Sequence, residues 1–179
     1  VLPAEAPPLP YGARIAFVSN RDGQPSLYVM RAADGGDIAR LTSGTDASGK
    51  LTWSPDSRRL AFTCGVMGTS ADVCVVNADG SGFARLTTTG TDGGADWSPD
   101  GTRIAFVTYR FSVDGYGDIA TMAPDGSNVT RISRQSVQYP GGVDWSPGGT
   151  SIAYSRPYCS VLPDLSPGDN GGGSQRAVL

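Results

Sequence analysis

The sequence contains no histidine, and this absence removes several kinds of active site at once. Ser-His-Asp and Cys-His triads, the common zinc sites and the usual histidine general base all require an imidazole. Only three cysteines are present and no two form a Cys-x-x-Cys pair, which excludes thiolate metal sites and c-type haem attachment. Many aspartates remain, but no pair of them is singled out, so we expect a protein that is not an enzyme.

Charge and long apolar runs are also scarce. Charged residues make up 17% of the chain, and the basic and acidic residues are interspersed to a formal net charge of −3. No cluster of lysine and arginine forms the positive stripe that nucleic-acid binding needs. No apolar run approaches the roughly 20 residues of a membrane helix. We therefore expect no nucleic-acid partner and no membrane span.

Glycine and proline, in contrast, are abundant, with 25 and 13 residues, whereas glutamate, lysine and glutamine are sparse. This balance favours short strands joined by tight turns. Residues 1–12 are proline-rich, which is typical of an extended tail or linker. A start of this kind fits the removal of an export signal, and equally a boundary introduced by cloning. An extracytoplasmic location, periplasmic or secreted, is our expectation.

One motif of thirteen residues is written three times, as "TWSPDSRRLAFTC", "DWSPDGTRIAFVT" and "DWSPGGTSIAYSR". The tryptophans of these copies are separated by 44 and 48 residues. The apolar run after the turn occurs a fourth time, and its four copies begin at Ile15, Leu60, Ile104 and Ile152. A period in the forties with several strand-like segments per unit is typical of a β-propeller.

Each unit divides into four short segments. The first ends in tryptophan, and "SPDG" then forms a tight turn in which Gly101 and Gly149 fill a position that favours a positive φ, whereas Ser57 occupies it in the other copy. The "IAF" run follows, then a third run such as "VCVV", an Asp-Gly turn and finally "ARLT". Four antiparallel strands make one propeller blade, and stacking buries both faces of each blade. We expect the tryptophans to pack between blades.

Together, "WSPDG-x-x-IAF", the third apolar run, "ADG" and "RLT" resemble the WD-like repeat of TolB-type propellers, over about Ala13–Arg156. The resemblance implies an all-β fold of four-stranded blades. The same blades resemble the non-catalytic propeller of prolyl-oligopeptidase-type peptidases, so the likeness specifies fold more than function.

The number of blades in the chain is about three to three and a half. Residues 13–42 supply the second, third and fourth strands of one blade, two full blades follow over about 49–87 and 93–133, and residues 141–155 supply two strands. Residues 157–179 form a Gly/Pro-rich C-terminal segment in which "SPGDNGGGSQ" is expected to be loop. The incomplete ring leaves three alternatives: a fragment of a longer propeller, a ring completed by other copies, or a head-to-tail filament.

Two cysteines lie ten residues apart, Cys64 at the end of one apolar run and Cys74 inside the next. If these runs pair as a hairpin, the two could form a disulfide; otherwise they are buried thiols. Cys159 has no expected partner within the chain.

Oxygen-rich loops are the only candidate metal sites. Residues 20–24, "NRDGQ", and 113–118, "VDGYGD", place carboxylates between the second and third strands, where Ca²⁺ could bind. Neither loop has the full spacing of a known calcium loop, and Asp-Gly is common turn chemistry. We therefore expect no cofactor, with Ca²⁺ the remaining alternative.

Aspartates precede two of the tryptophans, and an arginine recurs in the last strand of each blade. Asp96 and Asp144 could line a central channel, or accept hydrogen bonds from neighbouring turns. Arg40, Arg85 and Arg131 are expected at the outer rim as solvated edge residues or salt-bridge partners.

The segment 109–118, "YRFSVDGYGD", departs most from the other copies. We predict that Tyr109, Phe111 and Tyr116 are exposed there and form a partner surface, with simple loop packing as the alternative. Asn128 begins an Asn-Val-Thr sequon, a candidate glycosylation site.

The sequence thus favours a non-enzymatic propeller that binds or scaffolds proteins in an extracytoplasmic space, as the TolB resemblance implies. Two alternatives stay open. One is a structural subunit that self-assembles into rings or filaments through its incomplete blades. The other is the propeller portion of a larger prolyl-oligopeptidase-like hydrolase.

Overall fold

The computed structural model describes residues 13–66, 69–112, 115–133, 142–155 and 174–178, and the description below concerns these residues. The expectations for residues 1–12, Cys159 and the glycine-rich run 168–173 lie outside them. All regular structure in the described chain is β, in fourteen strands that form four antiparallel sheets. No helix in the described part is long and apolar enough to cross a membrane.

The four sheets are successive propeller blades. Blade 1 contains β1 (Arg14–Ser19), β2 (Ser26–Arg31) and β3 (Ala39–Arg40); blade 2 contains β4 (Ser48–Trp53), β5 (Arg59–Cys64), β6 (Asp72–Asn77) and β7 (Ala84–Arg85). Blade 3 contains β8 (Asp92–Trp97), β9 (Ile104–Thr108), β10 (Asp118–Met122) and β11 (Thr130–Arg131). Blade 4 contains β12 (Val143–Trp145), β13 (Ser151–Ser155) and β14 (Ser174–Val178). The fold class and the two complete blades are confirmed.

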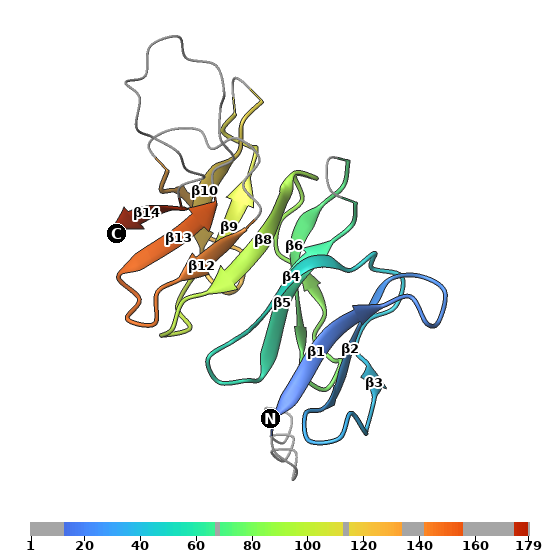
Figure 1. The fold of residues 1–179 in the computed structure, drawn as a ribbon. Helices are drawn as coiled ribbons and strands as arrows, with labels where there is room; N and C mark the ends of the chain where they lie inside the picture. The colour runs from blue at the N-terminus through green and yellow to red at the C-terminus, as the bar shows by residue number, and fades with distance from the viewer. Residues whose placement is uncertain (1–12, 67–68, 113–114, 134–141, 156–173, 179) are drawn as a thin grey trace, which may run out of the picture.

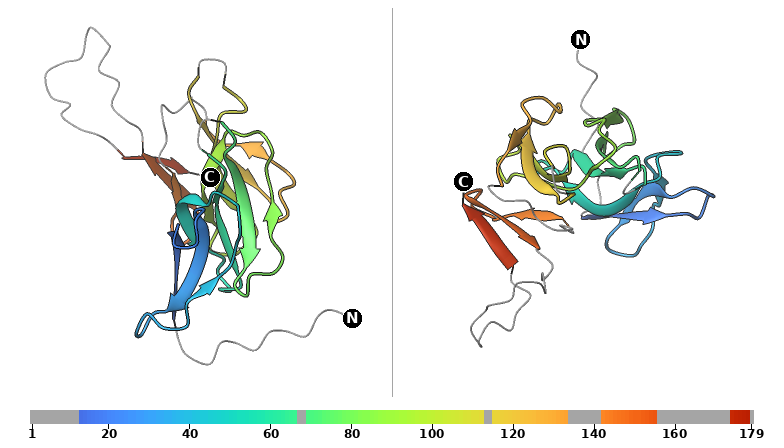
Figure 2. Two further views of the ribbon diagram at one scale, coloured as in Figure 1. Left: turned by 90° about the vertical axis from the view of Figure 1, so that its right-hand side faces the viewer. Right: turned by 90° about the horizontal axis from the view of Figure 1, so that it is seen from above.

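The sheets follow one another along an arc. Seen from above, the blue sheet of blade 1, the teal-to-green sheet of blade 2, the yellow-to-gold sheet of blade 3 and the orange-to-red sheet of blade 4 follow one another around the arc (Figure 2, right). The first strands of blades 2, 3 and 4 lie on the inside of this arrangement, and β4 and β12 both neighbour β8 (Figure 1). A propeller that is built in this way buries both faces of its inner blades.

One expectation about the C-terminal end is wrong. The sequence predicted two strands for the last blade and loop after them, but β14 pairs antiparallel with β13 from Ser151↔Val178 to Ser155↔Ser174. The segment "SQRAV" shows neither the aromatic nor the β-branched enrichment of the other third strands, so its strand character was not visible. Blade 4 consequently has three strands, as blade 1 does.

The core consists of three apolar layers, one between each pair of neighbouring blades. Residues alternate along a strand, so that Leu60 and Phe62 of β5 face blade 1 while Ala61 faces blade 3. The same alternation in β9 sends Phe106 toward blade 2 and Val107 toward blade 4. β5, β9 and β10 are therefore buried over almost their whole length.

The tryptophans pack between blades as expected. Trp53 packs in the layer between blades 1 and 2, Trp97 in the layer between blades 2 and 3, and Trp145 in the layer between blades 3 and 4. The guanidinium of Arg59, from blade 2, lies over the Trp97 ring at 4.8 Å from its centroid. Each tryptophan thus joins its own blade to the preceding one.

The turn after each tryptophan has the expected backbone. Gly101 and Gly149 adopt φ values of 71° and 68°, and Ser57 takes the same left-handed conformation with φ 57°. In blade 3 the hydroxyl of Ser98 donates to Asp100 Oδ1 at 2.6 Å, and the backbone N–H of Arg103 donates to Ser98 Oγ at 2.9 Å. The serine hydroxyl therefore connects the two ends of the turn.

These turns make stability depend on acid. The hydrogen bond from Ser98, followed by the one from the Thr102 N–H, holds the pKa of Asp100 below its ordinary value, and Ser54 does the same for Asp56. Because the folded pKa is lowered, this stabilisation is present above the ordinary pKa of about 3.9 and is lost as pH falls through the folded pKa. We expect the melting temperature to fall as the pH drops below about 4, toward the lowered pKa values of Asp100 and Asp56.

The Ser98→Ala variant tests this dependence. Without the hydroxyl the pKa of Asp100 returns toward its ordinary value, so the variant loses less stability than the parent does as the pH drops below about 4, although it is less stable at neutral pH. Thermal melts at several pH values measure the difference. Equal pH dependence in the two proteins would contradict the role given to the serine.

Candidate functional site

A charged cluster lies on the inner strands of three consecutive blades. Thr52, Asp96 and Asp144 occupy the same position, directly before the tryptophan, in β4, β8 and β12. Lys50 lies two residues before Thr52, on the same face of β4. It is the only lysine in the chain. The cluster therefore combines one ammonium group with side chains from blades 2, 3 and 4.

The ammonium group of Lys50 has three oxygen partners. Its Nζ lies 3.1 Å from Asp96 Oδ1 and 2.6 Å from Asp144 Oδ1, and it donates to the backbone carbonyl of Val143 at 2.6 Å. The Lys50 side chain is 28% exposed, so these contacts are partly shielded from water. The Lys50 ammonium group thus links β4 to both β8 and β12.

The two aspartates of the cluster have different environments. Asp96 is 15% exposed and accepts hydrogen bonds from Thr52 Oγ1 at 2.8 Å and from the Trp145 backbone N–H at 2.7 Å. Asp144 is 74% exposed, and Lys50 is its ion-pair partner. Asp96 therefore fixes neighbouring inner strands, which is the hydrogen-bonding alternative from the sequence, whereas Asp144 remains open to solvent. A channel-lining role stays a prediction.

Removal of the lysine should weaken the stacking of the blades. The Lys50→Met variant keeps the apolar stem but leaves Asp96 without its cation, and we expect a loss of about 1–2 kcal/mol in the free energy of unfolding. Asp144→Asn is the matched control, since its exposed ion pair should contribute less than about 0.5 kcal/mol. Denaturant titration measures both. Equal losses in the two variants would contradict the bridging role of Lys50.

The outer strands carry a second set of ion pairs, which the sequence predicted only in part. Arg131 Nη2 lies 2.8 Å from Asp118 Oδ1, and Arg85 Nη1 lies 3.5 Å from Asp72 Oδ2. Both carboxylates are almost fully buried, at 0% and 2% exposure. In blade 1 Ser26 replaces the aspartate, and Arg40 Nη2 donates to its hydroxyl at 2.9 Å.

These arginines are therefore salt-bridge partners in blades 2 and 3. The buried aspartates themselves were missed by the sequence analysis. Their signal is that Asp72 and Asp118 each begin a third strand and precede an arginine by 13 residues. A buried carboxylate requires such partners, because removal of its charge from water is costly.

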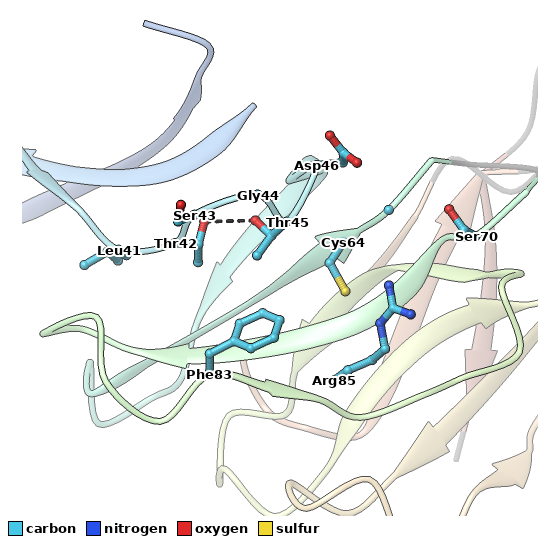
Figure 3. Close-up of a pocket in the computed structure, with 11 residues that line it drawn as sticks. Leu41, Thr42, Ser43, Gly44, Thr45, Asp46, Cys64, Ser70, Phe83 and Arg85 are labelled. Atoms are coloured by element: carbon cyan, nitrogen blue, oxygen red, sulfur yellow. Dashed lines mark hydrogen bonds between the residues drawn. The ribbon is translucent and has the colours of Figure 1, made fainter. Parts of the chain in front are cut away.

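A cavity of about 500 Å³ lies between blades 1 and 2 near the outer rim. One side is the loop 41–46 of blade 1, and the other contains Phe83 and Arg85 of blade 2 (Figure 3). Cys64 and Ser70 complete its end. This cavity is absent from the sequence predictions, because its two sides come from different blades.

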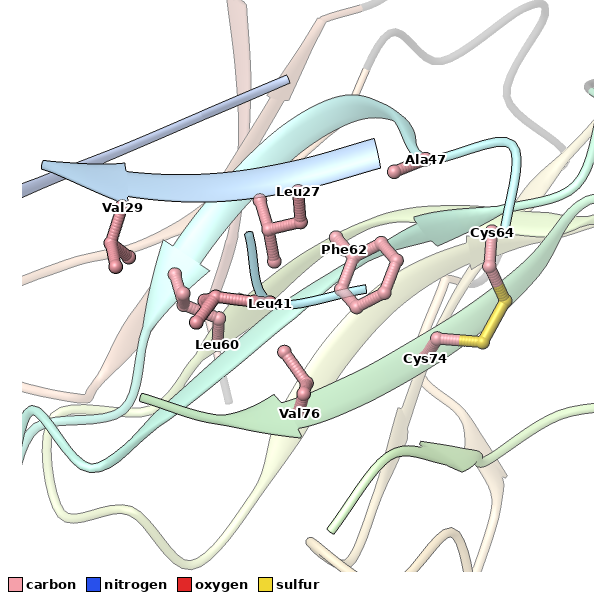
Figure 4. Close-up of a cluster of buried hydrophobic side chains, with 9 residues drawn as sticks. All are labelled: Leu27, Val29, Leu41, Ala47, Leu60, Phe62, Cys64, Cys74 and Val76. Atoms are coloured by element: carbon pink, nitrogen blue, oxygen red, sulfur yellow. A yellow bond between two sulfur atoms is a disulfide. The ribbon is translucent and has the colours of Figure 1, made fainter. Parts of the chain in front are cut away.

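The Cys64 and Cys74 sulfur atoms are bonded in the structure, with Cα atoms 5.8 Å apart. The two residues lie on one face of the β5–β6 hairpin, where Cys74 is directly opposite Phe62. Both belong to the apolar layer between blades 1 and 2 (Figure 4). The disulfide therefore links the two central strands of blade 2, β5 and β6, beside the cavity.

The predicted exposure of the aromatic residues in segment 109–118 is wrong. Tyr109, Phe111 and Tyr116 are each half-buried. Tyr109 packs against the layer between blades 3 and 4, and Phe111 against the layer between blades 2 and 3. The rings fill the ends of two different core layers, so they do not present one exposed aromatic face; a partner surface there remains untested.

The remaining candidates are placed as follows. Asp118, at the end of the second candidate calcium loop, is engaged by Arg131 and by the Ser133 hydroxyl at 2.8 Å. Asp22, in the first loop, accepts the Tyr28 hydroxyl at 2.6 Å. Among the described residues, no three acidic or cysteine side chains come together as metal ligands.

Asn128 is exposed and adopts φ 56°, which leaves its modification a prediction.

Fold and site together define the described region as a run of non-identical β-propeller blades joined by polar contacts between inner strands. The sequence matches no protein-family profile. It is 32% identical over 117 residues, 65% of this chain, to the Protein TolB homolog of Chlorobium luteolum. It is 38% identical over 79 residues, 44% of this chain, to the Tol-Pal system protein TolB of Anaeromyxobacter dehalogenans.

Solved structures agree with these relatives. The TolB-type structure from Agrobacterium tumefaciens matches 85% of this chain with a TM-score of 0.71 and 25% identity. TolB from Acinetobacter baumannii matches 83% with a TM-score of 0.67 and 21% identity. Most of the chain is therefore a TolB-like β-propeller region, and the resemblance drawn from the sequence is confirmed.

This chain covers only part of the length of each of these relatives. The chain spans 26% and 18% of the two curated proteins, and 53% and 36% of the two solved chains. What those complete proteins do is therefore evidence for a proposal about this chain and not a property already shown for it.

Proposed function

We propose that the chain is a non-enzymatic propeller module that binds a protein partner through the outward face of blade 1. This face is formed by Ile15 and Phe17 of β1 and Tyr28 and Met30 of β2, which are paired across the hairpin. Tyr28 is itself only 2% exposed, because Phe17 stacks on its ring and Arg21 lies over it. Ile38 lies beside β3 at the rim of the same sheet. We call this set of five residues the back face.

The back face repeats positions that are buried in every other blade. Ile15 corresponds to Leu60, Ile104 and Ile152 in the repeat. Those three side chains are 0% exposed because each packs against the preceding blade, whereas Ile15 is 42% exposed. The single observation that carries the proposal is this contrast, since an apolar surface of the core type gains free energy when it is covered.

Its rim adds polar features suited to a specific contact. The Arg21 guanidinium lies over the stacked Phe17 and Tyr28 rings, at 5.2 Å and 5.1 Å from their centroids. In the described chain β1 is the edge strand of its sheet. The equivalent strands of blades 2 and 3, β5 and β9, are each also paired with the inner first strand of their blade, β4 and β8. An extended segment of a partner could therefore add to this edge while its side chains cover the face.

An extracytoplasmic site of action is part of the proposal. The Cys64–Cys74 bond supports it, because disulfides persist mainly in oxidising compartments. The likeness to proteins named for the Tol-Pal system supports both this location and a role in protein binding without catalysis.

A second copy of the chain is the alternative partner. The observation that favours it is that blade 4 presents its own outer sheet face, on which Ala153 is exposed, at the other end of the arc. Docking of blade 4 from one copy onto blade 1 of another would repeat the blade-to-blade packing already present three times. Such a contact is heterologous and gives rings or filaments.

Light scattering after size-exclusion chromatography, combined with affinity capture, tests both versions of the proposal, a different protein as the partner and a second copy of the chain. Self-assembly predicts a mass that rises with concentration in the parent and not in Ile15→Asp. Binding of another protein predicts monomers in both, with capture of a specific partner by the parent alone. The control is Val66→Asp, which changes a 56% exposed apolar residue away from the back face. If Ile15→Asp leaves mass and capture unchanged, the proposal is wrong.

A further inference from the structure

The cavity between blades 1 and 2 contains an arginine whose donors are largely unused. Arg40, Arg85 and Arg131 occupy the same position in the last strands of blades 1, 2 and 3. Arg40 donates from Nε to the Thr42 carbonyl and from Nη2 to Ser26 Oγ, at 2.7 Å and 2.9 Å. Arg131 engages Asp118 through Nε and Nη2, at 3.0 Å and 2.8 Å. In both arginines, the forked set of guanidinium N–H donors is therefore occupied.

Arg85 differs from both of these. Its contact with Asp72 is a single one, from Nη1 at 3.5 Å, and its side chain is 46% exposed. Asp72 is also held by the Thr87 hydroxyl at 3.1 Å and the Gly90 N–H at 3.0 Å, so the arginine is one of several partners. The remaining N–H groups of the Arg85 fork are thus available to an acceptor in the cavity, and a carboxylate matches their geometry.

An aromatic ring lies next to this fork. Phe83 is two residues before Arg85, so both side chains are on one face at the edge of blade 2, and Figure 3 shows them on the same side of the cavity. Phe83 is 48% exposed, and its ring is tilted against Phe62 at a centroid distance of 6.4 Å. Its outer face is available for stacking against an apolar surface of a ligand.

The opposite side of the cavity is rich in hydroxyl groups. Ser43 is exposed, and Thr45 donates its hydroxyl proton to Thr42 Oγ1 at 3.0 Å, which leaves the Thr45 oxygen as an acceptor. Ser70 Oγ accepts from the Val66 N–H at 3.2 Å and keeps its own proton to donate. Asp46, in the same loop, adds a carboxylate acceptor. This side therefore offers both donors and acceptors.

We propose that the cavity between blades 1 and 2 binds an acidic sugar, such as a uronic acid unit of a saccharide. The sugar carboxylate pairs with the Arg85 fork, the C–H face of the ring stacks on Phe83, and the sugar hydroxyls bond to Ser43, Thr45, Ser70 and Asp46. A cavity of about 500 Å³ is within the size range of small-ligand sites, roughly 300–1,000 Å³. A peptide carboxylate would satisfy Arg85 but would leave the hydroxyl-rich side unused.

Isothermal titration calorimetry with three probes tests the proposal. D-Glucuronate carries the carboxylate and the hydroxyls, D-glucose lacks the carboxylate, and N-acetyl-L-leucine carries a carboxylate without sugar hydroxyls. We expect glucuronate to bind at least about tenfold more tightly than either of the others. Arg85→Met should remove that preference over glucose, and Phe83→Ser should weaken both sugars.

Matched variants identify a merely structural effect. Ile38→Ser is the control for Phe83→Ser, since Ile38 has the same position in blade 1 and the same 48% exposure. Arg21→Met is the control for loss of an exposed arginine outside the cavity. Arg85→Lys keeps the charge and loses the fork, so it provides a second test if Arg85→Met does not fold. Ile15→Asp should bind glucuronate normally, which separates this site from the proposed protein-binding face.

Three outcomes would overturn the proposal. Equal affinity for glucose and glucuronate would show that Arg85 does not select the acid. Binding of N-acetyl-L-leucine as tight as that of glucuronate would indicate a peptide site instead. Absence of measurable binding by any probe, in folded protein, would show that the cavity is not a sugar site.

Discussion

Phe106→Ala should be among the most destabilising single substitutions in the chain, with an expected loss of about 3–5 kcal/mol in the free energy of unfolding. Phe106 is 0% exposed and lies in the layer between blades 2 and 3, where it packs with Trp97 and Met122. Its truncation removes a large apolar surface and leaves a cavity that two rigid sheets cannot close.

Phe17→Ala is the matched control for this substitution. Phe17 occupies the same position in blade 1, but it lies on the back face and contacts Tyr28 and Arg21 there. We expect a loss of only about 1 kcal/mol in the monomer. Denaturant-induced unfolding followed by tryptophan fluorescence measures both variants. A similar loss at the two positions would mean that blade 1 is covered in the same way as blade 3.

Gly126→Ala should also be strongly destabilising, with a loss of about 2–4 kcal/mol in the free energy of unfolding. Gly126 lies in the Asp-Gly turn of blade 3 with φ 86°, and a Cβ there would lie 2.7 Å from the Leu86 carbonyl oxygen of blade 2. The clash is with backbone at the junction of two blades, so relief requires the sheets to move apart. Gly80 makes the corresponding approach to the Leu41 carbonyl of blade 1, at 3.4 Å.

Gly115→Ala separates the clash from the cost of the backbone conformation. Gly115 has almost the same φ, 81°, but a Cβ there would meet nothing within 4 Å. Its substitution should therefore cost about 1–2 kcal/mol, the strain of a left-handed alanine alone. Thermal or denaturant unfolding gives both values. If the two alanines cost the same, the turn of blade 3 does not interlock with blade 2.

The repeat made most of the fold predictable, because each blade is specified locally. Turn residues, β-branched runs and the tryptophan lie within about 40 residues of one another, which is why the two complete blades and the conformation of Ser57 were predicted. β14 was missed because its pairing with β13 spans a segment with no strand pattern of its own. Local sequence carries little information about such a pairing.

Contacts between blades were less accessible to sequence reasoning. Lys50 and Asp144 are 94 residues apart, and nothing in either local motif indicates that they meet. The buried positions of Asp72 and Asp118 were also missed, since an aspartate at the start of a strand resembles an ordinary turn residue. The aromatic residues of segment 109–118 were expected at the surface because their loop was unusual, yet two of them extend the core layers.

Amide hydrogen exchange tests the central claim most directly, namely that the back face of blade 1 is a docking surface. At the lowest measurable protein concentration, peptides from β5 and β9 should exchange slowly, whereas those from β1 should exchange quickly. Binding of a partner should then slow exchange in blade 1, and association with a second copy should slow exchange in blade 4 as well. Exchange of β1 as slow as that of β9 in the dilute protein would contradict this account.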